Sequence, residues 1–372
     1  MKWLFWTSLS IILYTYFGFP LWLWLRRTLR PRRPTRSSCT PQISIVMVVR
    51  NEAEILRRKL ENLLHLDYPP ELVQIIVVSD GSTDGTEVIL HEYGKTQRVD
   101  SLIKPIAQGK AAGLNDARQL AHGEIIVLTD ARQMLEIQSV RLLMEGFAEP
   151  SAGCVSGDLM LGDPISGESG KGTGLYWSFE KKIREAESAT GSVVGATGAF
   201  YAVRKSLLVA PPPGTILDDV YIPMQVARSG ARVSFDARAK AWDSPDLGRN
   251  REFKRKVRTL TGNYQLLQLA PWLLTRENPL RFEFISHKLF RLLIPFALAG
   301  LLVASAALHG TIYRTALAAQ LAVYGLSLLA MVRLRLGIVS RAADAAHTFV
   351  FLNTAALVAF INFITRRKPA WG

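Results

Sequence analysis

The sequence has few cysteines, and it lacks both the ligand spacing of a cysteine metal site and the phosphate-binding run of P-loop kinases. Its 372 residues include only two cysteines, Cys39 and Cys154, and their spacing matches no metal-ligand pattern. No GxxxxGK[ST] run is present, which excludes a P-loop kinase. We therefore expect neither a cysteine zinc site nor a disulfide framework, and both cysteines are interpreted as structural or incidental.

Acidic residues are scarce relative to basic ones. The chain has 45 Lys and Arg against 31 Asp and Glu, a formal net charge of +14. A block without any acid follows the first apolar run and holds Arg26, Arg27, Arg30, Arg32, Arg33 and Arg36. No recognition-helix or zinc-finger spacing accompanies this charge. We therefore expect the basic block to lie beside a bilayer and expect no nucleic-acid partner.

Charged residues are absent from Trp3–Leu25, a run long enough to cross a hydrocarbon core of about 30 Å. A cleaved signal peptide is the alternative, but the run is too long and is followed by arginines instead of small residues. Three further apolar runs near the C-terminus predict more spans: Leu289–Leu308, Ala316–Val332 and Thr348–Ile364. The sequence predicts an integral membrane protein with the lipid bilayer as a partner.

The positive-inside rule gives this protein an expected orientation. The arginine block places the domain that follows it in the cytoplasm, at the cell membrane, and Arg333, Arg335 and Arg341 agree. Four crossings would put the C-terminus outside, where the basic residues Arg366, Arg367 and Lys368 fit poorly. A re-entrant or interfacial apolar segment is therefore an open alternative.

The middle of the chain alternates strand-like and helix-like segments. Strands are predicted at Ile43–Val49, Val73–Val78, Leu102–Ile106 and Glu124–Thr129, and helices at Glu52–Leu66 and Ala111–Ala121. This order favours an α/β domain with a mostly parallel sheet. The predicted division is a transmembrane helix at 1–25, a basic linker at 26–41, the α/β domain at 42–262, an interfacial amphipathic segment at 263–287 and a membrane region at 288–372. The amphipathic segment includes Asn263–Leu274.

The segment Ser79-Asp80-Gly81-Ser82-Thr83-Asp84-Gly85-Thr86 directly follows the apolar run that ends at Val78. Ligands of open α/β sheets dock at the carboxyl ends of strands, so Asp80 points to a binding site. The simpler interpretation is a strand followed by an Asp-Gly turn.

Polar side chains follow two further predicted strands. Asn51 and Glu52 come after the first strand, where they suit either nucleotide contacts or a helix N-terminus. Asp130 follows the fourth strand as an oxygen ligand for a hard cation. Lys110, after Gly109, begins a predicted helix and can either reach a phosphate or face solvent.

The later part of the α/β domain adds an acidic pair and a basic pair. Asp218 and Asp219 precede a predicted helix, where they suit either acid–base chemistry or helix capping. Arg255 and Arg258 are three residues apart, so both can face one side of a helix. They suit either a diphosphate or a lipid surface.

Taken in order, these segments resemble the family-two glycosyltransferases, with similarity to cellulose synthase and poly-N-acetylglucosamine synthase-like enzymes. The run from Ser79 to Thr86 is similar to the signature DDGSxDGT, with Ser79 in place of the first Asp. The resemblance covers roughly residues 42–262 and implies the GT-A fold. Two departures are Arg132, where a second metal-binding Asp usually stands, and Thr259, where processive members carry a Trp that stacks on the growing chain.

The resemblance implies a role for each of these residues. Asn51, Glu52 and Asp80 would bind the nucleoside of the donor. Lys110, Arg255 and Arg258 would bind its diphosphate, and Asp130 would hold Mg²⁺ or Mn²⁺. Asp219 would be the general base toward the acceptor hydroxyl, beside Asp218.

The function expected from these features is that of a membrane-bound inverting glycosyltransferase. It would transfer a sugar from a nucleotide-sugar, in particular a UDP-sugar, to a lipid-linked or polysaccharide acceptor. A processive polysaccharide synthase is one alternative. A non-catalytic membrane protein that binds nucleotide-sugars is the other, motivated by Arg132 and by the missing Trp.

Overall fold

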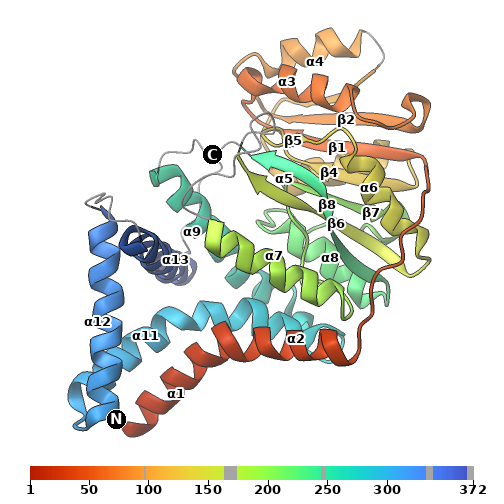
Figure 1. Cartoon of the computed structure of the whole chain (residues 1–372). Coiled ribbons are helices and arrows are strands. Elements are labelled where there is room, and N and C mark those ends of the chain that lie inside the picture. The colour runs from red at the N-terminus through yellow and green to blue at the C-terminus, as the bar shows by residue number, and fades with distance from the viewer. Residues whose placement is uncertain (96–97, 163–173, 244–248, 332–337, 367–372) are drawn as a thin grey trace.

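The computed structural model has two regions, an α/β domain and a group of long apolar helices beside it (Figure 1). The structure describes residues 1–95, 98–162, 174–243, 249–331 and 338–366. Val332, Arg333, Arg335, Arg367 and Lys368, which entered the predicted spans and orientation, lie outside the described residues.

Four parallel strands form one half of the sheet, in the order β3-β2-β1-β4. Their bounds are β1 Ile43–Val49, β2 Val73–Asp80, β3 Asp100–Lys104 and β4 Ile125–Thr129. β1 begins and ends as predicted, whereas β2 continues to Asp80 and β3 lies two residues earlier than expected. Apolar, largely β-branched residues such as Ile45, Ile76 and Val127 explain why these segments form buried strands. All four carboxyl ends therefore reach the same edge of the sheet.

The other half of the sheet is mixed, so the prediction of a mostly parallel sheet needs correction there. Its strands are β5 Met134–Leu135, β6 Ala152–Leu161, β7 Phe200–Arg204 and β8 Arg232–Asp243. β7 runs antiparallel to β4 and β6, and β5 antiparallel to β8, while β6 and β8 are parallel. Inserting β7 between β4 and β6 ends the run of parallel neighbours.

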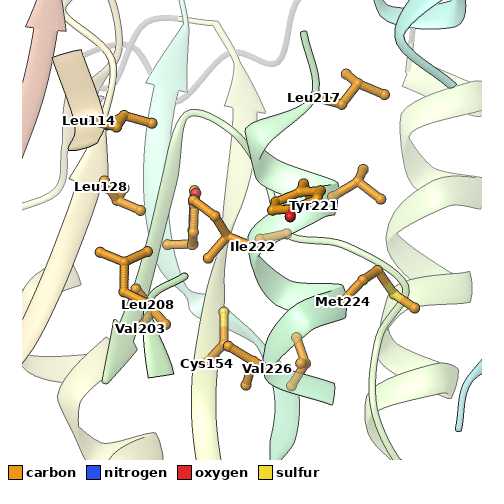
Figure 2. Packing of buried hydrophobic residues seen from close by; sticks show 14 of the residues in the cluster. Leu114, Leu128, Cys154, Val203, Leu208, Leu217, Tyr221, Ile222, Met224 and Val226 are labelled. Carbon is orange, nitrogen blue, oxygen red and sulfur yellow. The ribbon is translucent and has the colours of Figure 1, made fainter. Parts of the chain in front are cut away.

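Helices cover both faces of the sheet because residues along each strand alternate in direction. Val46 and Val48 of β1 face α5 (Lys110–Leu120) and α8 (Asp218–Arg228), where Leu114 and Ile222 join one core (Figure 2). Met47 of β1 belongs to the opposite core. That second core is covered by α3 (Ala53–Leu64), α4 (Thr86–Gly94) and α6 (Ser139–Glu145).

Four described helices are long and apolar enough to cross a membrane: Lys2–Leu29, Arg281–Ala307, Thr311–Met331 and Ser340–Ile364. The first consists of α1 (Lys2–Leu13), a π-helical turn at Tyr14–Gly18 and α2 (Phe19–Leu29). The second consists of α10 (Arg281–Phe284), a π-helical turn at Ile285–Leu289 and α11 (Phe290–Ala307). The others are α12 (Thr311–Met331) and α13 (Ile338–Ile364). Phe5 of α1 packs against Leu301 and Ala304 of α11.

The segment expected to be an interfacial amphipathic helix is instead part of the α/β domain. Helix α9 (Arg249–Leu269) runs through the predicted boundary at 262, and a 3₁₀ turn at Pro271–Leu274 follows it. Leu266 and Leu273 are fully buried in the core that also contains α8. The leucines that suggested a lipid-facing stripe thus bury against protein. Val257 and Tyr264 of α9 pack against α13, so α9 joins the two regions.

Helix α7 (Gly174–Ser188) makes the second junction between the regions. Ile183 and Ala186 of α7 pack against Phe19 and Leu23 of α2. Figure 1 shows α7 between the sheet and the two apolar helices α2 and α11. Side chains of α7 that point away from α2 therefore lie between the sheet and the two apolar helices.

Candidate active site

Lys110 brings together acids from two different elements. Its Nζ lies 2.9 Å from Oδ1 of Asp130, at the end of β4, and 3.4 Å from Oδ2 of Asp218, at the start of α8. Burial alone would lower the pKa of Lys110, but Asp130, Asp218 and Asp219 outweigh burial and raise it. Lys110 is therefore a charged ammonium that links the carboxyl end of β4 to α8.

Asp80 holds the loop that precedes Lys110. Its fully buried carboxylate accepts hydrogen bonds of 2.8 Å from the backbone N–H groups of Gln108 and Gly109. Gly81 has φ +65°, and a Cβ there would lie 2.6 Å from the backbone nitrogen of Ala107. The two loops therefore approach so closely that only glycine fits. Both Asp80 oxygens are engaged within the protein.

Asn51 and Glu52 lie at the carboxyl end of β1 and differ in the hydrogen bonds of their side chains. Asn51 has φ 55°, and its Oδ1 accepts a hydrogen bond of 2.8 Å from the backbone N–H of Thr83. Glu52 is half-buried, and its carboxylate accepts no hydrogen bond from the part of the chain that the structure describes. Burial raises the pKa of Glu52, Asp130 and Asp84 add to the rise, and Arg132 opposes it. Asn51 therefore fixes the loop. The Glu52 carboxylate faces the site and accepts no hydrogen bond from the described residues.

Arg132 and Arg255 share one buried carboxylate, that of Asp243 at the end of β8. Arg132 Nη2 lies 2.5 Å and Arg255 Nη1 3.2 Å from Oδ2 of Asp243, whose side chain is 1% exposed. The other oxygen, Oδ1, is buried without a hydrogen-bond partner among the described residues. Asp243 thus positions Arg255, one of the predicted site residues. This role of Asp243 was not visible in the sequence. Arg258 lies one turn further along α9 and is half-buried.

Asp130 suits a cation that takes most of its ligands from elsewhere. Its side chain is 41% exposed, and only Oδ1 is held by Lys110. The described residues contain no group of three or more His, Cys, Asp or Glu able to hold a metal on their own. Mg²⁺ and similar hard cations accept one or two carboxylates together with water and phosphate oxygens. The donor set therefore fits a cation completed by a diphosphate.

A buried lysine that sequence reasoning missed supports the loop that carries Asp130. Lys59 of α3 is fully buried and donates to Oγ1 of Thr129 at 3.0 Å and to the carbonyl oxygen of Gln133. Burial lowers the pKa of Lys59 to about 7, and the nearby Asp130 opposes that shift. No sequence signal separates Lys59 from the surface lysines of an amphipathic helix.

Asp218 and Asp219 are adjacent in sequence and differ in environment. Asp218 has a 7% exposed side chain and faces Lys110. Asp219 is more open, and a Cβ at Gly198 would lie only 2.8 Å from its Oδ2. Burial and Asp218 raise the pKa of Asp219, while Lys110, Lys288 and Arg184 oppose the rise. Asp219 therefore resembles a base, and Asp218 a fixed partner of Lys110.

The structure thus brings Lys110, Asp130, Asp218 and Asp219 together, with Asn51 and Glu52 at the same sheet edge. Arg255 reaches this edge through Asp243 and Arg132. Asp80 stabilises this group indirectly, by accepting hydrogen bonds from the backbone of the loop at 108–109.

Comparisons with known proteins show what the chain is similar to. The family model described as Glycosyl transferase family 2 matches residues 44–209. The chain is 25% identical over 234 residues to a poly-beta-1,6-N-acetyl-D-glucosamine synthase of Staphylococcus epidermidis, covering 62% of this chain and 56% of that protein. It is 24% identical over 229 residues to the synthase of the same name from Staphylococcus aureus, covering 60% and 55%. The matched region thus spans little more than half the length of these relatives.

One solved structure is similar over nearly the whole chain. It is the mannosyltransferase PcManGT from Pyrobaculum calidifontis, in complex with GDP-Man and Mn²⁺. The TM-score is 0.73 at 21% sequence identity, with 98% of this chain and 99% of that chain covered. At this level of identity the likeness concerns the fold, including the apolar helices around the α/β domain.

Proposed function

This chain belongs to the family-two glycosyltransferases and has the GT-A fold; on that premise we propose that it is a membrane-bound inverting enzyme. It transfers a sugar from a nucleotide diphosphate donor, in particular a UDP-sugar, to a lipid-linked or polysaccharide acceptor. The observation that carries the proposal is the position of Lys110, between the acid that ends β4 and the acids that begin α8. A donor-side and an acceptor-side carboxylate thereby face one another across a single cation.

The donor binds along the carboxyl edge of the parallel strands. Glu52 supplies a carboxylate for the nucleoside, and Asn51 and Asp80 hold the two loops that border it. Lys110, Arg255 and Arg258 provide positive charge for the diphosphate, and guanidinium groups suit phosphate geometry in particular. Asp243 keeps Arg255 and Arg132 pointed toward this edge before the donor arrives.

Asp130 would hold a divalent cation, Mg²⁺ or Mn²⁺, that neutralises charge on the diphosphate. The similar mannosyltransferase was solved with Mn²⁺, and the exposed Asp130 carboxylate fits such an ion. When bound, the cation supplies positive charge that stabilises the leaving nucleoside diphosphate. Lys110 and Lys59 orient Asp130 and its loop for this task.

Asp219 removes the proton from the acceptor hydroxyl. The hydroxyl oxygen forms a bond to the anomeric carbon, the bond from that carbon to the diphosphate oxygen breaks, and the nucleoside diphosphate leaves with the electron pair. Attack from the face opposite the leaving group inverts the anomeric configuration. A pKa raised by burial and by Asp218 makes Asp219 a stronger base than a free aspartate.

The four apolar helices and the arginine block support a place in the cell membrane with the α/β domain in the cytoplasm. The acceptor therefore reaches Asp219 from the bilayer side, where α7 and α11 adjoin the α/β domain. A processive polysaccharide synthase is the second candidate, favoured by the names of the staphylococcal relatives. The length of the product distinguishes the two.

A donor screen with purified full-length protein and Mn²⁺ tests the proposal. UDP-glucose, UDP-N-acetylglucosamine, UDP-galactose and GDP-mannose are compared by release of the nucleoside diphosphate. We expect slow hydrolysis of one UDP-sugar and faster turnover when acceptor is present. Binding of the nucleotide without turnover of any donor would favour a non-catalytic nucleotide-sugar-binding protein.

A further inference from the structure

Two cationic side chains lie beside Asp219 on the side that faces the apolar helices. Arg184 comes from α7, one residue after Ile183, which packs on α2. Lys288 comes from the π-helical turn that begins the second apolar helix. Both side chains are half-buried, so they lie neither in bulk solvent nor in the core.

Arg184 is fixed close to the base. Its Nη1 donates a hydrogen bond of 2.5 Å to Oγ1 of Thr197. Thr197 directly precedes Gly198, where an added Cβ would lie 2.8 Å from Oδ2 of Asp219. The backbone N–H of Ala196, in the same loop, donates to the backbone carbonyl of Asp219 at 2.7 Å. The guanidinium therefore contacts the loop that cradles the base.

Lys288 is placed by its neighbour, His287. The two ring nitrogens of His287 lie 2.7 Å from Oε1 of Glu187 and 3.2 Å from Oε2 of Glu180, both on α7. These contacts hold the start of the second apolar helix against α7. Lys288 and Arg184 both oppose the rise in the pKa of Asp219, as cations in its neighbourhood do.

The carboxylates around these two cations are already engaged. Glu187 interacts with His287 and with the backbone N–H of Val194 at 3.3 Å. Glu180 interacts with His287 and Arg291. Across the described ranges, neither Arg184 nor Lys288 has a carboxylate within ion-pair distance, 4.0 Å. Asp219 alone is a poor counter-ion because catalysis requires it to take up a proton.

A third cation, Lys256 of α9, extends the positive surface. Its Nζ lies 5.2 Å from the ring centroid of Trp177 on α7. Burial lowers the pKa of Lys256 to about 8, and Arg255 and Arg184 add to that shift. Positive charge thus accumulates around α7, and within it Arg184 and Lys288, partly removed from bulk water with no carboxylate within 4.0 Å among the described residues, favour an anionic ligand.

We propose that Arg184 and Lys288 form a binding site for the phosphate group of a lipid carrier, so that the acceptor is a lipid-phosphate-linked saccharide. The inference rests on the proposed function, since it names the acceptor of the same site. The donor diphosphate has other cations, Lys110 and Arg255, which are held by Asp130, Asp218 and Asp243. The junction of α7 with α2 and α11 places this second anion where a lipid headgroup meets the bilayer.

Binding is measured without donor, so that the result does not depend on turnover. Full-length protein in phosphatidylcholine nanodiscs is titrated with a polyprenyl phosphate and, separately, with the uncharged polyprenol, and bound lipid is counted by native mass spectrometry. We expect the phosphate to bind about tenfold more tightly or better, as charge-assisted hydrogen bonds to phosphate imply. The double variant Arg184→Gln/Lys288→Gln should lose this preference, and Arg184→Lys/Lys288→Arg should largely keep it.

Matched controls separate this site from general attraction to anionic lipid. Lys182 and Arg281 are exposed cations on the same two helices, and Lys182→Gln/Arg281→Gln should keep the full preference. Equal binding of phosphate and polyprenol by the unaltered protein would overturn the proposal. So would displacement of the polyprenyl phosphate by an equal amount of phosphatidylglycerol, because the site would then bind headgroups in general.

A third experiment tests whether Arg184 and Lys288 bind the donor instead of the lipid phosphate. The affinity for the nucleoside diphosphate, measured by calorimetry with Mn²⁺, should be the same in Arg184→Gln/Lys288→Gln as in the unaltered protein. A loss of tenfold or more would assign these cations to the donor and contradict the proposal. If the lipid preference is observed but no donor is turned over, the phosphate site stands and the proposed transferase activity fails.

Discussion

At the ends of β2 and β4, Asp80 and Asp130 are engaged by donors from the protein itself, whereas Arg184 of α7 and Lys288 have no carboxylate within 4.0 Å among the described residues. Asp80 accepts two backbone N–H groups, and Asp130 faces Lys110. Arg184 donates to Thr197, and Arg184 and Lys288 both oppose the rise in the pKa of Asp219, the group whose charge must change. We call these two parts the donor side and the acceptor side.

The difference follows from what each side has to do. The diphosphate, on which negative charge develops as the sugar leaves, is best met by groups fixed in advance, since pre-organised dipoles cost no rearrangement during the reaction. The acceptor side must receive a group and take up its proton, so its charges need an incoming counter-ion. Changes on the donor side should therefore affect binding and stability, and changes on the acceptor side should affect transfer.

The strongest test of this division is Asp219→Asn. Loss of a general base should lower the transfer rate by about 10²- to 10⁴-fold. Donor affinity should be unchanged because Lys110 retains Asp130 and Asp218. Initial rates and calorimetry on the same preparation check both statements. A variant that transfers as fast as the unaltered enzyme would remove Asp219 from the role of base.

Removal of the divalent cation should have the next largest effect. Because the cation supplies several kcal/mol of charge stabilisation, chelation should lower the rate by about a hundredfold or more. Addition of Mn²⁺ or Mg²⁺ in excess of the chelator should restore it. Activity that persists in a chelator would mean that Lys110, Arg132 and Arg255 stabilise the leaving group on their own.

Asp80→Asn should affect binding and stability together. Asparagine offers one acceptor oxygen in place of two, so one of the two backbone N–H groups loses its partner at this buried side chain, at a cost of about 1–3 kcal/mol in the free energy of unfolding. Donor affinity should fall because the loop before Lys110 loosens, while the rate at saturating donor persists. Glu71→Gln, at an exposed position, is the control. A normal melting temperature in Asp80→Asn would argue against this supporting role.

The pH dependence should show the smallest change. Transfer needs the Asp219 carboxylate, so the rate falls as the pH drops through the pKa of that group. Because that pKa is raised, the loss should begin well above the ordinary aspartate value of about 3.9. Arg184→Gln/Lys288→Gln removes cations that hold the pKa down and should shift the acid limb to still higher pH. An acid limb that does not move would contradict the electrostatic effect of Arg184 and Lys288 on Asp219.

The sequence predicted the donor side better than the acceptor side. Strands β1 and β4 and the residues that end them were found because a buried parallel strand followed by polar residues is a local pattern. Lys110, Asp130 and Asp219 were found by resemblance, and the structure brings them together. What Asp80 does was not visible, since its partners are backbone groups about thirty residues further along the chain.

The rest depended on long-range packing. Arg184 and Lys288 lie in helices whose sequences look like an ordinary charged surface and the beginning of a membrane span. Asp243 acquires its role only where β8 meets Arg132 and Arg255. The leucines of α9 matched a lipid-facing helix equally well, because periodicity reports an apolar face without saying what covers it.

A structure of the full-length protein with a nucleoside diphosphate and Mn²⁺ tests the central claim most directly. The account predicts the diphosphate between Asp130, Lys110 and Arg255, the metal on Asp130, and Asp219 open toward the bilayer side. A diphosphate bound at Arg184 and Lys288, or away from the carboxyl edge of β1 and β4, would contradict it.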